Sequence, residues 1–71
     1  MMQRYQVTVV DKILNARFVE VHQADSWQSA VLAHSRIGAE FEDLEDIEDL
    51  QRRAASYEYY IEVKDIRDVK S

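Results

Sequence analysis

The stretch ARFVEVHQADSWQSAVLAHSRIG, residues 16–38, decides the fold, because the spacing of its apolar residues changes in the middle. Its first half alternates with a period of two, which is typical of a β-strand. Val19 and Val21 share one face of this strand, and Phe18, Glu20 and His22 share the other. In its second half the spacing becomes three and four, which is the stripe of an amphipathic helix. The stripe consists of Trp27, Ala30, Val31, His34 and Ile37.

The expected helix has a signal at each end. Asp25 or Ser26 can cap its first turn with a side-chain oxygen. Gly38 follows the last residue of the stripe, at the place where a left-handed residue commonly ends a helix. We therefore expect this helix to run from residue 27 to the residue before Gly38.

Two other segments alternate as strands do. Residues 5–10 place Tyr5, Val7 and Val9 on one face, and Asn15 can take the left-handed conformation of the tight turn that follows. Near the other end of the chain, residues 57–64 alternate in the same way. Tyr57, Tyr59, Ile61 and Val63 share one face there, and Glu58, Tyr60, Glu62 and Lys64 share the other. Asp65 breaks this phase, and Ile66 and Val69 follow at three-residue spacing, which predicts a bulge or a short tail.

A second helix is predicted for residues 43–56. Its buried stripe is expected to comprise Leu44, Ile47, Leu50 and Ala54. Phe41 precedes them by a spacing that drifts around an ideal helix, so we place it in the connection, where a 3₁₀ start is possible.

The order strand, strand, helix, helix, strand predicts an α+β fold. We expect a two-layer sandwich in which two helices cover one face of a three-stranded antiparallel sheet, in a single domain of residues 1–71. The third strand can pair with the first, which gives the strand order 2-1-3. The sheet residues expected beneath the helices are Val7, Val9, Val19, Val21, Ile61 and Val63.

Composition narrows the function. The chain has 71 residues, no cysteine and one glycine, so disulfides, thiolate metal sites and glycine-rich phosphate loops are excluded. It has no run of 18 apolar residues and no pattern of a secretory signal, so we expect a cytoplasmic protein without a membrane span. Its net charge of −5 disfavours direct binding to nucleic acid. A core this small often needs support, and self-association is the expected form.

The segment EFEDLEDIED, residues 40–49, holds seven of the 14 acidic residues. A solvated helix explains part of this, because acids early in a helix and bases such as Arg52 and Arg53 late in it complement the helix dipole. It does not explain the number of acids, since neighbouring carboxylates repel one another. We therefore keep two interpretations, a solvated face and a surface for a basic partner; a cation site is disfavoured because calcium-loop spacing is absent. The predicted partner-binding acids are Glu42, Asp43, Glu45, Asp46, Glu48 and Asp49.

A second partner-binding patch is predicted on the sheet face that the helices leave open. Phe18 and Tyr60 are expected there with Val10, among polar residues, and such a patch can serve a partner or a homodimer. His22 and His34 are the only histidines, and no further ligand or nucleophile accompanies them in a known motif. No metal, cofactor or catalytic residue is predicted.

The motifs YQVTVV, FVEVHQADSWQSAVLAH and YYIEVKDIRDV resemble small phage and mobile-element accessory proteins of β-β-α-β build. Some proteins of this general build are anti-CRISPR proteins, which bind a host effector complex and block it. The resemblance implies a non-enzymatic inhibitor of a host complex that handles nucleic acid. The surplus of acidic charge in residues 40–49, and not the resemblance, predicts that this segment mimics nucleic acid against a basic host protein. The alternatives are a structural or regulatory homodimer without such mimicry and a small enzyme with a His/Asp site.

Overall fold

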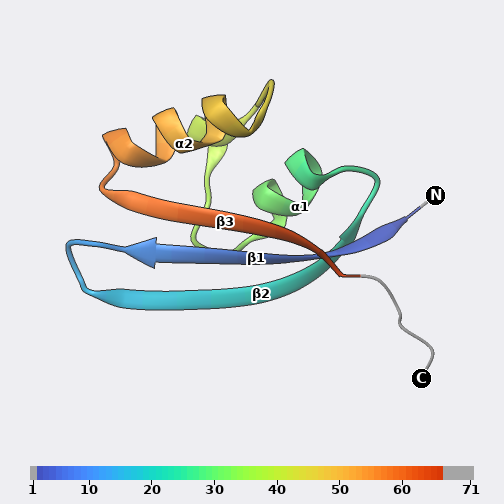
Figure 1. Cartoon of the computed structure of the whole chain (residues 1–71), viewed down its shortest axis with the longest axis horizontal. Coiled ribbons are helices and arrows are strands. Elements are labelled where there is room, and N and C mark those ends of the chain that lie inside the picture. Colours follow the sequence, from blue (N-terminus) through green and yellow to red (C-terminus); the bar gives the residue numbers. More distant parts are fainter. Residues whose placement is uncertain (1, 67–71) are drawn as a thin grey trace.

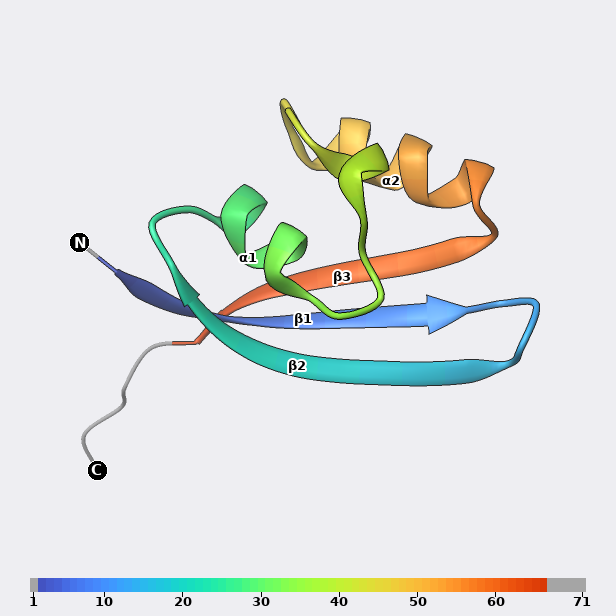
Figure 2. The same cartoon turned by 180° about the vertical axis from the view of Figure 1, so that it is seen from behind.

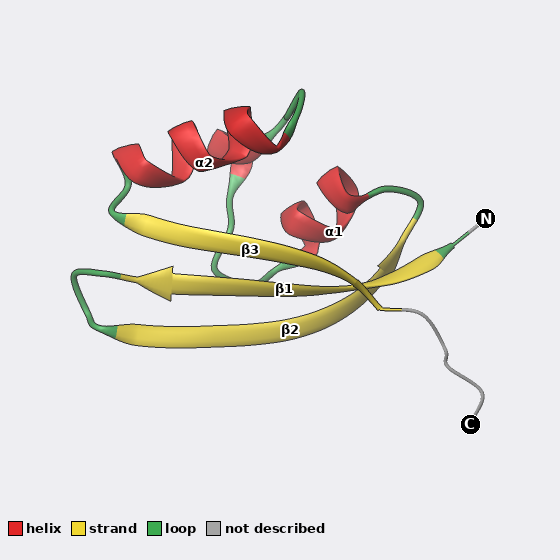
Figure 3. Cartoon of the chain, viewed as in Figure 1, coloured by secondary structure: helices red, strands yellow, loops and turns green. Residues whose placement is uncertain are grey.

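The computed structural model describes residues 2–66, in which a three-stranded antiparallel sheet carries its helices on one face (Figures 1 and 2). The elements are β1 (Gln3–Asp11), β2 (Ala16–Ala24), α1 (Trp27–Ala33), the 3₁₀ helix η1 (Ala39–Phe41), α2 (Ile47–Ser56) and β3 (Tyr59–Ile66). β1 lies in the middle, in the order β2-β1-β3. The predicted α+β class, element order and strand order are confirmed (Figure 3).

The turn between β1 and β2 sets the register of the sheet. Asn15 has φ 56°, so the predicted left-handed turn residue is confirmed. Asp11 holds the turn from the other side, because its Oδ1 accepts the backbone N–H groups of Ile13 at 3.0 Å and Leu14 at 3.1 Å. The last residue of β1 thereby faces Ala16, the first residue of β2.

This register reverses the predicted faces of β2. Val9 lies opposite Phe18, and residues directly opposite each other share a face of the sheet. Because Val9 is buried under the helices, Phe18 lies on the helix side as well. Val19 and Val21 consequently lie on the open side, 49% and 51% exposed, and their predicted burial is wrong. Alternation gives the two faces of a strand but not which one is inside, and a shift of one residue exchanges them.

β3 keeps its phase to its end. Tyr59, Ile61 and Val63 face the helices, as predicted, and Tyr60 lies on the open side. Asp65 pairs with Tyr5 in the same regular register, so the bulge predicted at Asp65 is wrong. Val69, which the same prediction named, lies outside the described residues.

The first helix is shorter than predicted. Ser26 caps α1 by accepting the N–H of Ser29, which confirms one of the two expected caps. The helix ends at Ala33, and Gly38 has an extended backbone with φ −122°, so the predicted end of the helix at Gly38 is wrong. His34 explains the early end: its buried ring accepts the N–H of Arg36 at Nδ1, 3.1 Å, and this bond turns the chain out of the helix.

The second helix begins later than predicted. Asp46 is its N-cap, with a side-chain oxygen 2.8 Å from the N–H of Asp49, and the helix runs from Ile47 to Ser56. Asp competes for local backbone bonds and therefore favours a cap over a helix interior. Ile47 is 48% exposed, so its predicted burial is wrong. Leu50 and Ala54 are buried as predicted; Leu44 is also buried, but it reaches the core from the connection.

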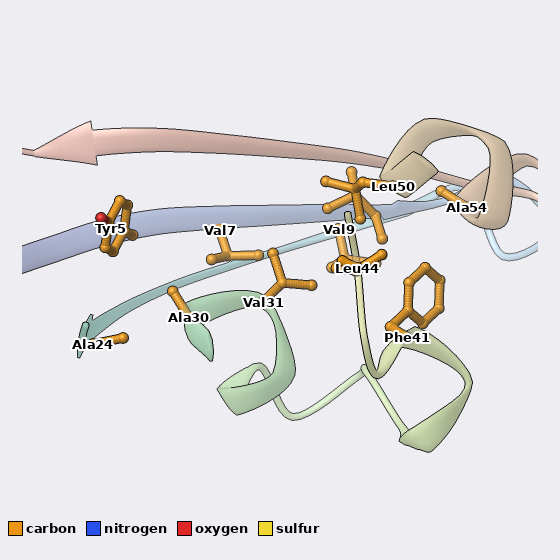
Figure 4. Packing of buried hydrophobic residues seen from close by; sticks show 11 residues of the cluster. Tyr5, Val7, Val9, Ala24, Ala30, Val31, Phe41, Leu44, Leu50 and Ala54 are labelled. Atoms are coloured by element: carbon orange, nitrogen blue, oxygen red, sulfur yellow. The ribbon is translucent and has the colours of Figure 1, made fainter. Parts of the chain in front are cut away.

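The core lies between the sheet and the helix layer. α2 packs along β3 and α1 packs over β2 and β1. Figure 4 shows Val7 and Val9 of β1 facing Val31 of α1 and Leu50 of α2. Phe41, placed in the connection by its spacing, is fully buried in η1. The connection from η1 to α2 is thus anchored by apolar side chains on the inside, while its backbone runs over the surface.

Glu58, which follows α2, has a strained backbone conformation with φ 60°. A side chain with a Cβ is strained in this left-handed region, whereas glycine is not. We expect Glu58→Gly to raise the free energy of unfolding by about 0.5–1 kcal/mol in urea denaturation. Glu58→Gln removes the charge alone and should leave stability unchanged; an equal gain in both variants would assign the effect to charge.

Candidate functional site

Asp49 is the inner support of the acidic segment. It lies in α2 and is 6% exposed. One carboxylate oxygen accepts the N–H of Glu45 at 3.1 Å, and the other lies 3.1 Å from Nη2 of Arg52 and 3.2 Å from Nε of Arg53. The N–H of Glu45 is the main cause that lowers the pKa of Asp49, and Arg53 and Arg52 lower it further. Asp49 is thus an ionised, internally paired group.

Arg53 connects this carboxylate to the loop that precedes α2. Its Nη2 lies 3.1 Å from Oδ2 of Asp49, which completes a two-point contact. Its guanidinium also donates to three backbone carbonyls before α2, those of Glu42 at 2.5 Å and Asp43 at 3.4 Å in the loop and that of Glu40 at 3.4 Å in η1. The side chains of the same three residues are exposed.

The acidic surface comprises the carboxylates that the structure exposes in this segment. Its members are Glu40, Glu42, Asp43, Glu45, Asp46 and Glu48. They lie on η1, on the loop farthest from the sheet in Figure 1 and on the first turn of α2. Within residues 2–66, the ion pairs of the segment all go to the buried Asp49, and none reaches a member of the acidic surface.

The structure divides the predicted acidic residues into two groups. Glu42, Asp43, Glu45, Asp46 and Glu48 are exposed together, although Asp46 also caps α2. Asp49 is separated from them by its burial, so it supports the acidic surface and is not part of its exposed side. Both bases late in the helix pair with Asp49, Arg53 at i,i+4 and Arg52 at i,i+3, and neither pairs with Glu48.

The predicted patch of Phe18 and Tyr60 is not one patch. Phe18 lies on the helix side, with the guanidinium of Arg36 4.4 Å from its ring centre. Tyr60 lies on the open side, 47% exposed and opposite Val10. The open face carries Tyr60 on β3 and Val19 and Val21 on β2, with β1 between them. Only the pairing of β2 with β1 across the four-residue turn places Val19 and Val21 on this face. The alternation within β2 fits equally well whichever face is inside.

A second polar cluster joins β2 to the end of α1. Glu20 accepts a hydrogen bond from the Ser35 hydroxyl group and lies 2.7 Å from Nε2 of His22. These two bonds, the one from Ser35 first, lower the pKa of Glu20 to about 2. His34 lies beside it as a neutral ring, because its Nδ1 accepts the N–H of Arg36 and its Nε2 donates to the carbonyl of Phe18 at 3.1 Å. The 3.9 Å separation of His34 Nδ1 from Glu20 is therefore not an ion pair.

The arrangement of Glu20, Ser35 and His22 suits a structural role and not nucleophilic catalysis. A serine nucleophile needs a base that takes its proton, with a carboxylate behind that base. Here the carboxylate of Glu20 stands between Ser35 and His22, and it already holds the hydroxyl group as a donor. The cluster closes the edge of β2 against the chain after α1. Sequence reasoning missed it because its partners are up to 15 residues apart and form no motif.

The lowered pKa of Glu20 predicts acid sensitivity. A carboxyl group whose pKa falls on folding, here from 4.5 to about 2, stabilises the fold above pH 4.5 and loses this effect as the pH falls toward 2. We expect the urea midpoint to fall through that interval. Glu20→Gln should have a flatter pH profile there, although Asp49 contributes in the same direction. Parallel profiles for the two proteins would contradict the role given to Glu20.

The described residues, 2–66, contain neither a metal-binding cluster nor a membrane-spanning helix. Between residues 2 and 66, histidine and acidic side chains form no group of three or more arranged to hold a metal ion. Among the same residues, neither helix has the length and apolar character to cross a membrane. A scan of protein-family models and searches of curated proteins and of solved structures found no match to this chain.

Proposed function

We propose that this protein is a binding module without catalytic activity, and that its acidic surface docks on the basic surface of a host protein that handles nucleic acid. The observation that carries this proposal is a set of exposed carboxylates without ion pairs, most of them on a loop whose backbone Arg53 holds by hydrogen bonds. The resemblance to phage and mobile-element accessory proteins supports an inhibitor of anti-CRISPR type, acting in the host cytoplasm.

The charges of the acidic surface are explained better by a basic partner than by stabilisation of the fold. Glu48 lies near the start of α2, where a negative charge is favourable. Glu42 and Glu45 lie in the loop before the cap, so helix electrostatics do not account for them. Each also adjoins another acid in the sequence, which adds repulsion. A basic groove on a partner would compensate this repulsion. The opposite charges would also steer the partner toward the acidic surface from a distance.

The fixed backbone favours tight recognition. Arg53 and Asp49 hold the loop before any partner arrives, and Asp46 fixes its junction with α2. A surface ordered in advance loses little conformational entropy on binding. Carboxylates carried on this ordered backbone can then occupy lysine and arginine sites that otherwise take the phosphates of nucleic acid.

Capture from a bacterial lysate tests this proposal. The triple patch variant carries Glu42→Gln, Glu45→Gln and Glu48→Gln, which spares the cap Asp46 and the buried Asp49. The triple control variant carries Asp25→Asn, Glu58→Gln and Glu62→Gln, three exposed acids elsewhere. We expect the native chain and the triple control variant to retain a basic partner at about 0.05 M salt and to release it at about 0.5 M, because salt screens exposed charges.

The triple patch variant should retain no such partner. A partner that both triple variants hold equally, at low and high salt, would move the interface away from the acidic surface. Absence of any partner for the native chain would contradict the proposal itself.

A homodimer through the open sheet face is the second candidate. Val19, Val21 and Tyr60 leave about half of each side chain exposed on that face. Sheets pack face to face through such side chains. Analytical ultracentrifugation would show a dimer for the native chain and a monomer for Val21→Glu; a monomer for both would exclude this candidate.

A further inference from the structure

A hollow of about 270 Å³ opens between the starts of the two helices and the sheet below them. It is lined by Tyr5 of β1, Trp27 of α1, Ile47 of α2, and Val63 and Asp65 of β3. Four of the five lining side chains are apolar or aromatic, and the fifth is a carboxylate. The hollow lies just below the usual volume of a drug-sized site, so it suits a small group such as one side chain.

The lining selects the chemistry of that group. The rings of Tyr5 and Trp27 attract a cation to their faces, and the carboxylate of Asp65 adds a charged acceptor. Ile47 and Val63 match the methylene stem of a long basic side chain, which packs on apolar surface while its charged end makes polar contacts. A carboxylate or phosphate ligand would meet the charge of Asp65 and is disfavoured.

The hollow adjoins the acidic surface. Ile47, one of its walls, stands between Asp46 and Glu48 in the sequence, and both are members of that surface. Ile47 is 48% exposed although it is a large apolar residue, which is the exposure expected of a wall that a partner covers. Charge complementarity therefore favours the same kind of occupant for the hollow and for its rim.

We propose that this hollow is a socket for one arginine or lysine side chain of the basic partner. The inference rests on the proposed function and deepens it: the acidic surface attracts the partner, and the socket of Tyr5, Trp27, Ile47, Val63 and Asp65 anchors one of its side chains. The stem lies against Ile47 and Val63, and the charged end meets the aromatic rings and Asp65.

Trp27 makes the socket observable, because it is the single tryptophan of the chain. The probes are acetyl-(Gly-Arg)₄-amide, its lysine form and its citrulline form, which keeps the shape of arginine without the charge. We expect the arginine and lysine peptides to shift the Trp27 indole N–H signal in NMR in a saturable way, and the citrulline peptide to leave it in place. Asp65→Asn should weaken the affinity reported by Trp27 about tenfold, the effect of one charge-assisted contact.

Two further variants keep the result interpretable if Asp65→Asn disturbs the fold. Ile47→Lys puts a cation on the half-exposed wall and should abolish the Trp27 response. Glu62→Gln removes the same charge from the open side of β3 and should change it little. A cationic peptide that shifts the amide signals of residues 42–48 but not Trp27 would overturn the socket and leave the acidic surface standing. A Trp27 response that the triple patch variant keeps in full would overturn the role of the acidic surface in attracting the cation and leave the socket standing.

Discussion

Replacing Arg53 with methionine is expected to lower the free energy of unfolding by about 1–3 kcal/mol. The change leaves Asp49 without its two-point partner and removes the donor from three backbone carbonyls, those of Glu40, Glu42 and Asp43. Methionine keeps most of the apolar stem, so the loss measures the guanidinium contacts. Urea denaturation of the two proteins gives the difference, and NMR amide signals of residues 42–46 should broaden or move in the variant.

Arg52→Met is the matched control. Arg52 also contacts Asp49, at 3.1 Å, but its side chain is 71% exposed and bonds no loop carbonyl. An exposed ion pair of this kind contributes up to about 1 kcal/mol. Equal losses for Arg52→Met and Arg53→Met would mean that the loop does not depend on the inner guanidinium.

The second large effect concerns binding. We expect the triple patch variant to lose about tenfold to hundredfold in affinity for the captured partner, from three charge contacts of about 0.5–1 kcal/mol each. Its free energy of unfolding should stay within about 0.5 kcal/mol of the native value, because these carboxylates lack ion pairs and relief of repulsion offsets the loss at the helix start. Isothermal titration calorimetry and urea denaturation of the same samples measure both quantities.

The triple control variant changes the net charge by the same amount. Its affinity should fall less than threefold, since its substitutions lie outside the acidic surface and act only at long range. A similar loss in both triple variants would point to overall charge. A large loss of stability in the triple patch variant would show that the carboxylates serve the fold and not a partner.

The order of elements could be predicted from the sequence because the apolar period changes clearly at each boundary. Alternation in β2 and β3 and the stripe of α1 each depend on nearest neighbours in the chain. The three-residue spacing places Phe41 in the connection between the two α-helices, where it lies in η1. The inward face of β2 was predicted wrongly, since it depends on how the turn after Asp11 sets the pairing with β1.

The predicted ends of the two helices are wrong for a different reason. Side chains that hydrogen-bond to the backbone override the apolar spacing there. His34 ends α1 before its stripe is complete, and Asp46 starts α2 after the stripe has begun. The candidate site shows the same limit. The exposed acids were visible as a run of letters, whereas the internal role of Asp49 and the three loop contacts of Arg53 required the folded chain. Trp27 and Asp65, 38 positions apart, could not be joined by any local pattern.

Displacement of nucleic acid from the captured partner is the most direct test of the proposal that the acidic surface mimics a phosphate backbone. Fluorescence anisotropy of a labelled oligonucleotide bound to that partner would follow its release as each protein is added. The native chain and the triple control variant should displace the oligonucleotide at similar concentrations, and the triple patch variant should need about tenfold to hundredfold more. Equal displacement by all three proteins, or displacement by none of them, would contradict the proposal.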